Sequence, residues 1–354
     1  MQSLDMKYIQ SLKFTSDNIS TLKKIGEYKG KQDLFTHQTP EALETLRMAA
    51  VVESTESSNR IEGITAPHKR IENLVLKSTA PKNRSEQEIA GYRDALNLIH
   101  ESVKEMNLSV NIILQLHSVI YRYLPGQGGR WKMSDNEIVE KDQDSFIKRV
   151  RFKPVTAVAT VPSMGYLVER YNEDINVHNQ EPLVVIPLAI LDFLCIHPFT
   201  DGNGRVARLI TLLMLYHHGY SVGRYISLER IFEESKESYY ETLEKSSINW
   251  HEGTHDVFPW MTYFWGTLLR AYKEFEERVG TITTFKGSKT ELVKNAVRRR
   301  IKPFSISDIM SECPGISRDM IRLVLRQLRD KSMIKSLGVG RSSKWINSGF
   351  TEKP

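Results

Sequence analysis

The chain has 354 residues, more than a small single domain needs and enough to bury a large hydrophobic core. Hydrophobic residues make up 40% of the sequence and charged residues 26%, as is ordinary for a globular protein, and the aromatic content of 9% argues against disorder. The net charge is +6, and residues 286–349 hold fifteen Lys and Arg against five Asp and Glu, so the rest of the chain is slightly acidic.

The sequence gives no sign of secretion or membrane insertion. Cys195 and Cys313 are the only cysteines, and their wide separation supports neither a disulfide framework nor a zinc site. The first residues lack a continuous apolar stretch, and the most apolar run, 182–196, falls short of the roughly 20 residues that span a bilayer. We therefore expect a cytoplasmic protein in which this run forms a buried helix.

Helical periodicity predicts a mainly α fold. The amphipathic segments are 42–52, 86–100, 110–123, 188–196, 205–216 and 260–275. Within residues 136–155, two β-prone segments, around Ile138 and at 150–152, predict a β-hairpin flap on the helical core. We expect an N-terminal helical region (1–105), a core (106–282) and a C-terminal domain (283–354), with a linker at 283–288.

The segment HPFTDGNGRVAR, residues 197–208, carries the chemistry-bearing residues. DGNG separates two apolar helical runs, so it is predicted to be a loop that leads into a helix. Glycines let backbone N–H groups converge, and the start of a helix attracts anions, which favours a phosphate site. Arg205 and Arg208 are three apart, on one face of the first turn, which indicates more than one phosphate.

Two further side chains refine this interpretation. Asp201 inside a phosphate site predicts a bridging Mg²⁺, and hence a metal-bound nucleotide. His197 precedes Asp201 by four residues, and a neutral imidazole there can accept a proton from an attacking hydroxyl. The pattern favours phosphoryl or nucleotidyl transfer. The alternative is a common turn, a histidine that only caps a helix end, and arginines that are surface charges. Composition does not separate these two interpretations.

The same twelve residues fill every specified position of the Fic family signature, H-x-F-x-[DE]-G-N-G-R-x-x-R. The resemblance extends over about residues 42–275, including the hairpin. It implies transfer of AMP from ATP to a Ser, Thr or Tyr hydroxyl of a target protein, with release of pyrophosphate. An intact Gly204 favours adenylylation over phosphorylation.

The resemblance also implies a role for each motif residue. His197 would deprotonate the target hydroxyl, and Phe199 would anchor the loop. Asp201 would hold Mg²⁺, and the phosphates would be surrounded by Gly202, Asn203 and Gly204. Arg205 would bind the inner phosphates and Arg208 the γ-phosphate. Tyr239 and Tyr240 match a pair that borders the adenine, although two helical aromatics are as readily core residues. The hairpin would align the target by strand addition.

Upstream, Ser58, Glu62 and Gly63 match [ST]-x-x-x-E-[GN], which marks the inhibitory helix of many Fic proteins. Alone, this pattern is simply a helix end with glycine in the left-handed position. In a Fic protein it implies that Glu62 pairs with Arg208 and denies it to the γ-phosphate, so the inhibition is intramolecular. In some relatives the same glutamate also directs removal of AMP, and the sequence does not decide whether addition or removal of AMP prevails. Many relatives form homodimers, so the resemblance also implies a homodimer.

HEGTH, residues 251–255, matches the zinc protease pattern H-E-x-x-H. That site requires a continuous helix, whereas Gly253 disfavours helix, Asn249 and Asp256 are turn or cap residues and Pro259 suits the first turn of a following helix. No third ligand is evident. We expect an exposed loop here and no metal site.

The C-terminal region has the order of a winged helix-turn-helix: a short helix, a turn with Pro314 and Gly315, a longer helix capped by Ser317, and two strands. The longer helix would place arginines opposite its apolar face, at Arg318, Arg322, Arg326 and Arg329. With Arg341 and Lys344 this face suits DNA phosphates, and it suits protein contact equally well. The alternative function is therefore a nucleotide-sensing, DNA-binding transcriptional regulator.

Overall fold

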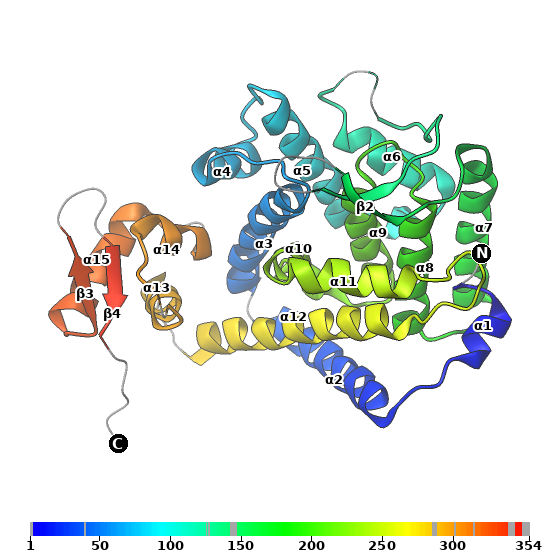
Figure 1. Ribbon diagram of the computed structural model, residues 1–354. Helices are drawn as coiled ribbons and strands as arrows, with labels where there is room; N and C mark the ends of the chain where they lie inside the picture. Colours follow the sequence, from blue (N-terminus) through cyan, green and yellow to red (C-terminus); the bar gives the residue numbers. More distant parts are fainter. Residues whose placement is uncertain are drawn as a thin grey trace.

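The structure is a computed structural model that describes residues 3–348 apart from 39, 125, 127, 142–146, 285–288, 301, 314–315 and 339–343. It is mainly helical, as predicted, with two short antiparallel hairpins. In the larger part (Figure 1) the helices are α1 (Met6–Ser11), α2 (Ser16–Gln38), α3 (Pro40–Ile61), α4 (His68–Leu76), α5 (Arg84–Ser102), α6 (Val110–Ile120), α7 (Ala157–Asn176), α8 (Pro182–Ile196), α9 (Asn203–His217), α10 (Leu228–Glu234), α11 (Lys236–Ser247) and α12 (Phe258–Thr284).

Helix α8 lies at the centre of one hydrophobic cluster that runs from Leu4 to Val279, and it packs against α7, α9 and α12. Pro187 has no N–H for the carbonyl of Leu183 one turn earlier, and Trp265 Nε1 donates to that carbonyl instead, at 2.7 Å. Nearly all residues of α8 are buried, so the predicted buried helix is confirmed. In the described part of the chain, no helix is both long enough and apolar enough to cross a membrane.

All six predicted helices are present, most of them longer than the periodic segment that indicated them. The prediction missed several helices, among them α2 and α7. Helix α7 carries Pro162 and Gly165, two residues that disfavour helix interiors. Buried side chains at helical spacing, such as Met164, Val168 and Tyr171, hold α7 against α8 regardless of this low propensity. Tertiary packing therefore overrides local preference in this helix.

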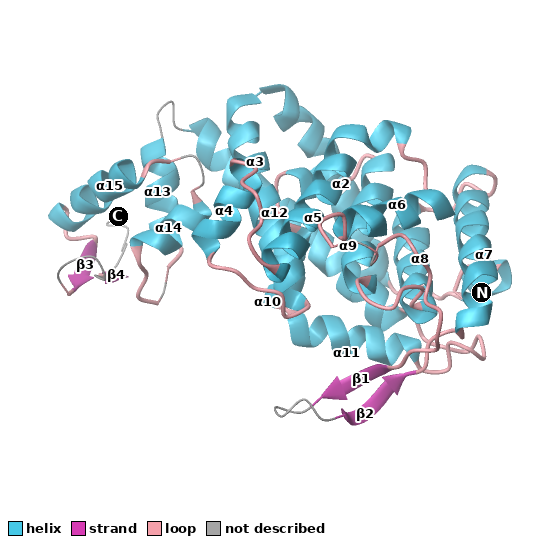
Figure 2. Cartoon of the chain, turned by 90° about the horizontal axis from the view of Figure 1, so that it is seen from above, coloured by secondary structure: helices cyan, strands magenta, loops and turns pink. Residues whose placement is uncertain are grey.

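The hairpin predicted within 136–155 is confirmed as β1 (Ile138–Lys141) paired antiparallel with β2 (Ile147–Phe152). It projects beside α11, which is clearest in Figure 2. Ion pairs from Arg149 (2.6 Å) and Arg151 (3.7 Å) to Glu244 join β2 to α11. The hairpin is therefore attached to the helical body by charge along one edge.

The C-terminal part has its own hydrophobic cluster, from Val293 to Trp345. It consists of α13 (Lys289–Arg298), α14 (Ile306–Glu312), α15 (Arg318–Asp330), β3 (Ile334–Leu337) and β4 (Lys344–Asn347). The predicted cap is confirmed, since Ser317 accepts from the backbone N–H of Met320. Helix α13 was not anticipated, and α12 reaches Thr284, so the linker cannot begin at residue 283. Residues 285–288, Pro314, Gly315 and Arg341 lie outside the described part.

Candidate active site

Residues 197–202 form a short loop between the buried helices α8 and α9, as predicted, although Asn203 and Gly204 already belong to α9. His197 is the C-cap of α8 in the left-handed conformation, with φ 50°, and Gly202 is the N-cap of α9, with φ 81°. The Asn203 side chain bonds both the N–H and the carbonyl of Phe199, each at 2.8 Å. Phe199 is fully buried and stacks on His117, so the loop is fixed from inside.

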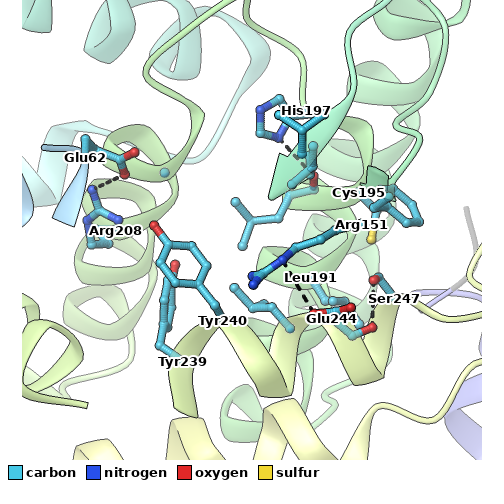
Figure 3. A pocket seen from close by; sticks show the side chains of 16 residues that line it. Glu62, Arg151, Leu191, Cys195, His197, Arg208, Tyr239, Tyr240, Glu244 and Ser247 are labelled. Atoms are coloured by element: carbon cyan, nitrogen blue, oxygen red, sulfur yellow. Dashed lines mark hydrogen bonds and ion pairs between the residues drawn. The ribbon is translucent and has the colours of Figure 1, made fainter. Parts of the chain in front are cut away.

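One pocket of about 440 Å³ lies beside this loop. Its lining comes from the end of α3, the hairpin, α8, the loop, α9 and α11. Figure 3 shows Glu62 and Arg208 on one side, and His197, Cys195 and Arg151 on the other. Residues far apart in the sequence thus form a single site with a charged end and a largely apolar wall.

His197 is poised to accept a proton. Its Nδ1–H donates to the carbonyl of Leu194 at 3.3 Å, which leaves Nε2 as the ring atom with a free lone pair. Burial, with a further contribution from the Lys132 ammonium, lowers the pKa of His197 to about 4. The imidazole is therefore neutral at physiological pH, the state that a general base requires.

Arg208 lies at the charged end and is only 2% exposed. Its Nε donates to Ser58 Oγ at 2.8 Å, and its Nη2 donates to Ser58 O at 2.9 Å and to Glu62 Oε1 at 2.7 Å. Its Nη1 is buried and has no hydrogen-bond partner among the described residues. An unsatisfied buried guanidinium N–H is costly, and an anion in the pocket would satisfy it.

Gly204 leaves room for such an anion. A Cβ at this position would collide with the Glu62 carboxylate and would lie 3.2 Å from Arg208 Nη1. The start of α9 has no side-chain cap, so no side chain competes with a ligand for its first N–H groups. The open space, the uncapped helix start and the unpaired N–H all fit phosphate oxygens.

Arg205 points away from Arg208 and does not line the pocket. It is fully buried, and its guanidinium donates to Glu88 at 2.8 Å and to the Tyr121 hydroxyl at 2.7 Å. The expectation that both arginines share one face toward the ligand is therefore wrong for the conformation seen here. The three-residue spacing placed the two Cα atoms correctly, but α5 and α3 supply different acceptors for the two long side chains.

Asp201 is exposed just before α9 and does not line the pocket. Its Oδ1 accepts from the Gly202 N–H at 2.7 Å, and its Oδ2 accepts from the Tyr121 hydroxyl at 2.9 Å. No group of three metal-binding side chains occurs among the described residues. A single accessible carboxylate still fits Mg²⁺ that arrives with a nucleotide, because Mg²⁺ commonly takes one or two carboxylates and completes its shell with phosphates and water.

Tyr239 and Tyr240 both line the pocket, and Tyr239 also packs in the core against Phe232 and Trp260. The structure thus accommodates both interpretations of this pair. Sequence reasoning did not single out the other lining residues, Leu191, Leu194, Cys195, Leu243, Glu244, Ser247 and Arg151. The spacing of 240, 243, 244 and 247 on α11 is a helical face, and that periodicity could have indicated its part of the wall.

HEGTH is a turn and loop, as predicted, with Gly253 at φ 72°. Its two histidines make separate contacts: His251 Nε2 bonds the carbonyl of Lys153 at 2.8 Å, and His255 Nε2 bonds Ser3 Oγ at 2.9 Å. The expectation of an exposed loop is wrong for His255, which is buried because the N-terminal segment packs over it.

Comparison with known proteins finds a Fic domain in this part of the chain. Residues 107–215 match the Fic/DOC family model. Relatives named "Protein adenylyltransferase Fic" from Drosophila ananassae and Drosophila melanogaster are each 24% identical over 232 residues, which is 62% of this chain and 40% of theirs. The chain thus spans less than half the length of these curated relatives.

Solved structures show the same fold. A Fic family protein from Desulfovibrio desulfuricans G20 matches with a TM-score of 0.62 at 19% identity, over 97% of this chain and 99% of its own. Fic-1 from C. elegans matches with a TM-score of 0.57 at 20% identity, over 75% of this chain and 74% of that structure. The fold and the motif together define a helical protein of the Fic type. Residues 107–215 thus correspond to a Fic domain, and the chain has the fold of the Fic proteins it resembles.

Proposed function

We propose that this protein is a protein adenylyltransferase that transfers AMP from ATP to a Ser, Thr or Tyr hydroxyl of a target protein. The observation that carries the proposal is the placement of a neutral His197, a side-chain-free Gly204 and an incompletely paired Arg208 around one pocket. The names of the curated relatives support the same activity.

In the proposed reaction, the target hydroxyl oxygen attacks the α-phosphorus of ATP while its proton passes to Nε2 of His197. A new P–O bond forms to the target, and the bond between the α- and β-phosphates breaks, so that pyrophosphate leaves. Asp201 would hold Mg²⁺ that arrives with the nucleotide, and the bound metal would supply neutralisation of the phosphate charge. The N–H groups at the start of α9, with Gly202, Asn203 and Gly204, surround the phosphates.

The remaining contacts are assigned by the same proposal. Arg208 binds the γ-phosphate through Nη1 and Nη2. Arg205 reaches the inner phosphates only by exchanging its contact with Glu88 for phosphate oxygens. Tyr239, Tyr240 and the apolar wall receive the adenine, and the target segment adds as a strand to the edge of the hairpin.

We further propose that Glu62 inhibits the enzyme from within the chain. Its carboxylate bonds Arg208 Nη2, so a γ-phosphate has to displace it before ATP can sit productively. Ser58 holds the same guanidinium in place. Glu62 lines the same pocket as His197. By likeness to relatives in which this glutamate directs water to remove AMP, we include removal of AMP from a modified target as a second direction of the same proposal.

The test is incubation of the protein with labelled ATP and Mg²⁺. We expect label on the protein itself and on a target in a host lysate, and we expect His197→Ala to abolish both while ATP binding persists. Label that persists in His197→Ala would overturn the proposed chemistry. Labelling from another triphosphate, with none from ATP, would replace AMP as the transferred group.

The C-terminal part favours a second candidate, a winged helix that binds DNA and makes the protein a nucleotide-sensing regulator. Helix α15 buries Ile321, Val324, Leu325 and Leu328, and its opposite face carries exposed arginines. Arg322 and Arg329 pair with Asp319 and Asp330 there, which lowers the free positive charge. A specific shift of duplex DNA without any ATP labelling would favour the regulator over the enzyme.

We also propose the division into residues 1–105, 106–282 and 283–354 and, from the cysteine usage, a cytoplasmic location. By likeness to the family we propose a homodimer. Size-exclusion chromatography with light scattering measures the oligomeric state, and a protein that elutes as a monomer at micromolar concentration would exclude the dimer.

A further inference from the structure

The segment directly before the hairpin holds the backbone of the catalytic loop. The N–H of Lys132 donates to the carbonyl of Pro198 at 2.9 Å, and its Nζ donates to the carbonyl of Ile196 at 3.1 Å. Asn136 Nδ2 donates to the carbonyl of Phe199 at 3.2 Å and to that of His197 at 3.5 Å. Four successive carbonyls, 196 to 199, are thus met by two residues outside the motif.

This arrangement, here called the Lys132–Asn136 clamp, forms one connected unit. Lys132 Nζ also donates to Asn136 Oδ1 at 2.8 Å, and Lys132 is only 3% exposed. A buried ammonium is unfavourable unless its protons find acceptors. The Lys132 ammonium has two acceptors here, the side-chain oxygen of Asn136 and the carbonyl of Ile196. Position 132 therefore requires a long side chain that can donate hydrogen bonds to both acceptors.

The clamp lies where the backbone needs support. His197 has φ 50° and ψ 60°, a left-handed conformation that disfavours residues other than glycine by about 1–2 kcal/mol. The last carbonyls of a helix also lack intrahelical partners, and Ile196 and His197 are at the end of α8. The bonds from Lys132 and Asn136 satisfy these carbonyls while His197 keeps its unusual conformation.

Lys132 also acts on the imidazole through its charge. Burial is the main cause of the low pKa of His197, and the Lys132 ammonium lowers it further, whereas Glu62 and Asp201 raise it. Burial lowers the pKa of Lys132 itself to about 8. The ammonium is therefore charged at neutral pH and favours the neutral form of the histidine.

We propose that Lys132, together with Asn136, is a positioning residue that aims Nε2 of His197 into the pocket and fixes it relative to the hairpin. The inference rests on the proposed transfer reaction and deepens it. Only Glu137 separates Asn136 from the first residue of β1, Ile138. A target strand that adds to the hairpin is consequently held at a set distance from the imidazole by the same short segment.

The experiment compares substitutions in a Glu62→Gly background, in which the inhibitory carboxylate is absent. Lys132→Met removes the charge and the donors, Lys132→Arg keeps both, and Lys153→Met removes an exposed lysine that lies near the hairpin and pairs with Glu137 at 3.7 Å. At saturating ATP we expect Lys132→Met to lower the labelling rate about 100-fold, the loss that follows a displacement of about 1 Å. We expect KM for ATP to stay the same, Lys132→Arg to recover most of the rate, and Lys153→Met to have no effect.

An NMR titration of the His197 ring, assigned by its loss in His197→Ala, gives a readout that does not depend on activity. Lys132→Met should raise the pKa of His197 and move the acid limb of the pH–rate profile upward, and Lys132→Arg should leave both in place. Asn136→Ser should lower the rate without moving this pKa, and it carries the test if Lys132→Met is not folded at the assay temperature.

A rate in Lys132→Met within threefold of the parent, or a Lys132→Arg variant no faster than Lys132→Met, would overturn the inference. If the Glu62→Gly parent labels nothing with any triphosphate, the proposed function fails instead. In that case the titration still decides on the clamp, because an unchanged His197 pKa in Lys132→Met contradicts it.

Discussion

Replacing Glu62 by glycine tests the inhibitory contact directly. In the structure, the Glu62 carboxylate accepts from Arg208 Nη2 at 2.7 Å, and the guanidinium also makes two bonds to Ser58, which the substitution does not touch. A hydrogen bond to a charged group contributes about 1.5–3 kcal/mol. Since 1.36 kcal/mol corresponds to tenfold, the substitution should favour productive ATP binding by about 10- to 150-fold.

Backbone effects of the substitution should be small. Helix α3 ends at Ile61, so a glycine at position 62 lies outside it, and Gly63 already adopts φ 81°. Loss of the carboxylate leaves a buried guanidinium without its counter-charge, so we expect lower thermal stability without ligand. ATP with Mg²⁺ should restore that stability, because a ligand that binds only the folded state stabilises it.

The assay is the initial rate of self-labelling with labelled ATP, measured across ATP concentrations for wild type, Glu62→Gly and Glu62→Gln. The control is Glu56→Gln, on α3, the helix that ends just before Glu62; the Glu56 carboxylate pairs with Arg60 and His68 and does not line the pocket. Equal rates in wild type and Glu62→Gly would refute the competition for Arg208. An equal gain in Glu56→Gln would show that any weakening of α3 suffices.

Two further predictions concern neighbouring groups. Gly204→Ala, made in the Glu62→Gly background so that a clash with Glu62 plays no part, should raise KM for ATP about tenfold or more, because its methyl group would fill the space 3.2 Å from Arg208 Nη1; an unchanged KM would place the phosphates elsewhere. Burial raises the pKa of Asp192, in α8, to about 6 from 3.8. The folded state therefore holds this proton more tightly than the unfolded state, and its contribution to stability is complete below about pH 4 and is lost as pH rises through 6. We compare the free energy of unfolding of Asp192→Asn with that of wild type by urea denaturation. From pH 4 to pH 8 the difference should change by about 2 kcal/mol in favour of the variant. A difference that does not depend on pH would show that Asp192 does not titrate in this range.

Much of the site is predictable from sequence because its chemistry is local. The glycines at 202 and 204 and the apolar runs around them predict a loop that feeds a helix, and the structure has both. His197 at the end of the preceding helix follows from the same reasoning. Helices with regular periodicity were found, whereas α7, with its internal proline and glycine, was not.

Contacts between distant segments were harder to predict. The spacing of Arg205 and Arg208 places them as neighbours on α9, but a long side chain turns toward whichever acceptor lies within reach. Glu88 on α5 takes the first arginine, and Ser58 and Glu62 near the end of α3 take the second. Glu62 was indicated only through resemblance to a known motif, since nothing in its local sequence distinguishes it from an ordinary helix end.

The sequence by itself determined the helical class of the protein, the loop-to-helix geometry around Gly202 and Gly204, and the match to the Fic signature, because these depend on residues within a few positions of one another. Only the tertiary structure decided which arginine faces the pocket, which carboxylate occupies it, and how Lys132 and Asn136 support the loop. The physical reason is that hydrogen-bond partners of buried charged and carbonyl groups are chosen by proximity in the folded chain, and packing of the helices sets that proximity.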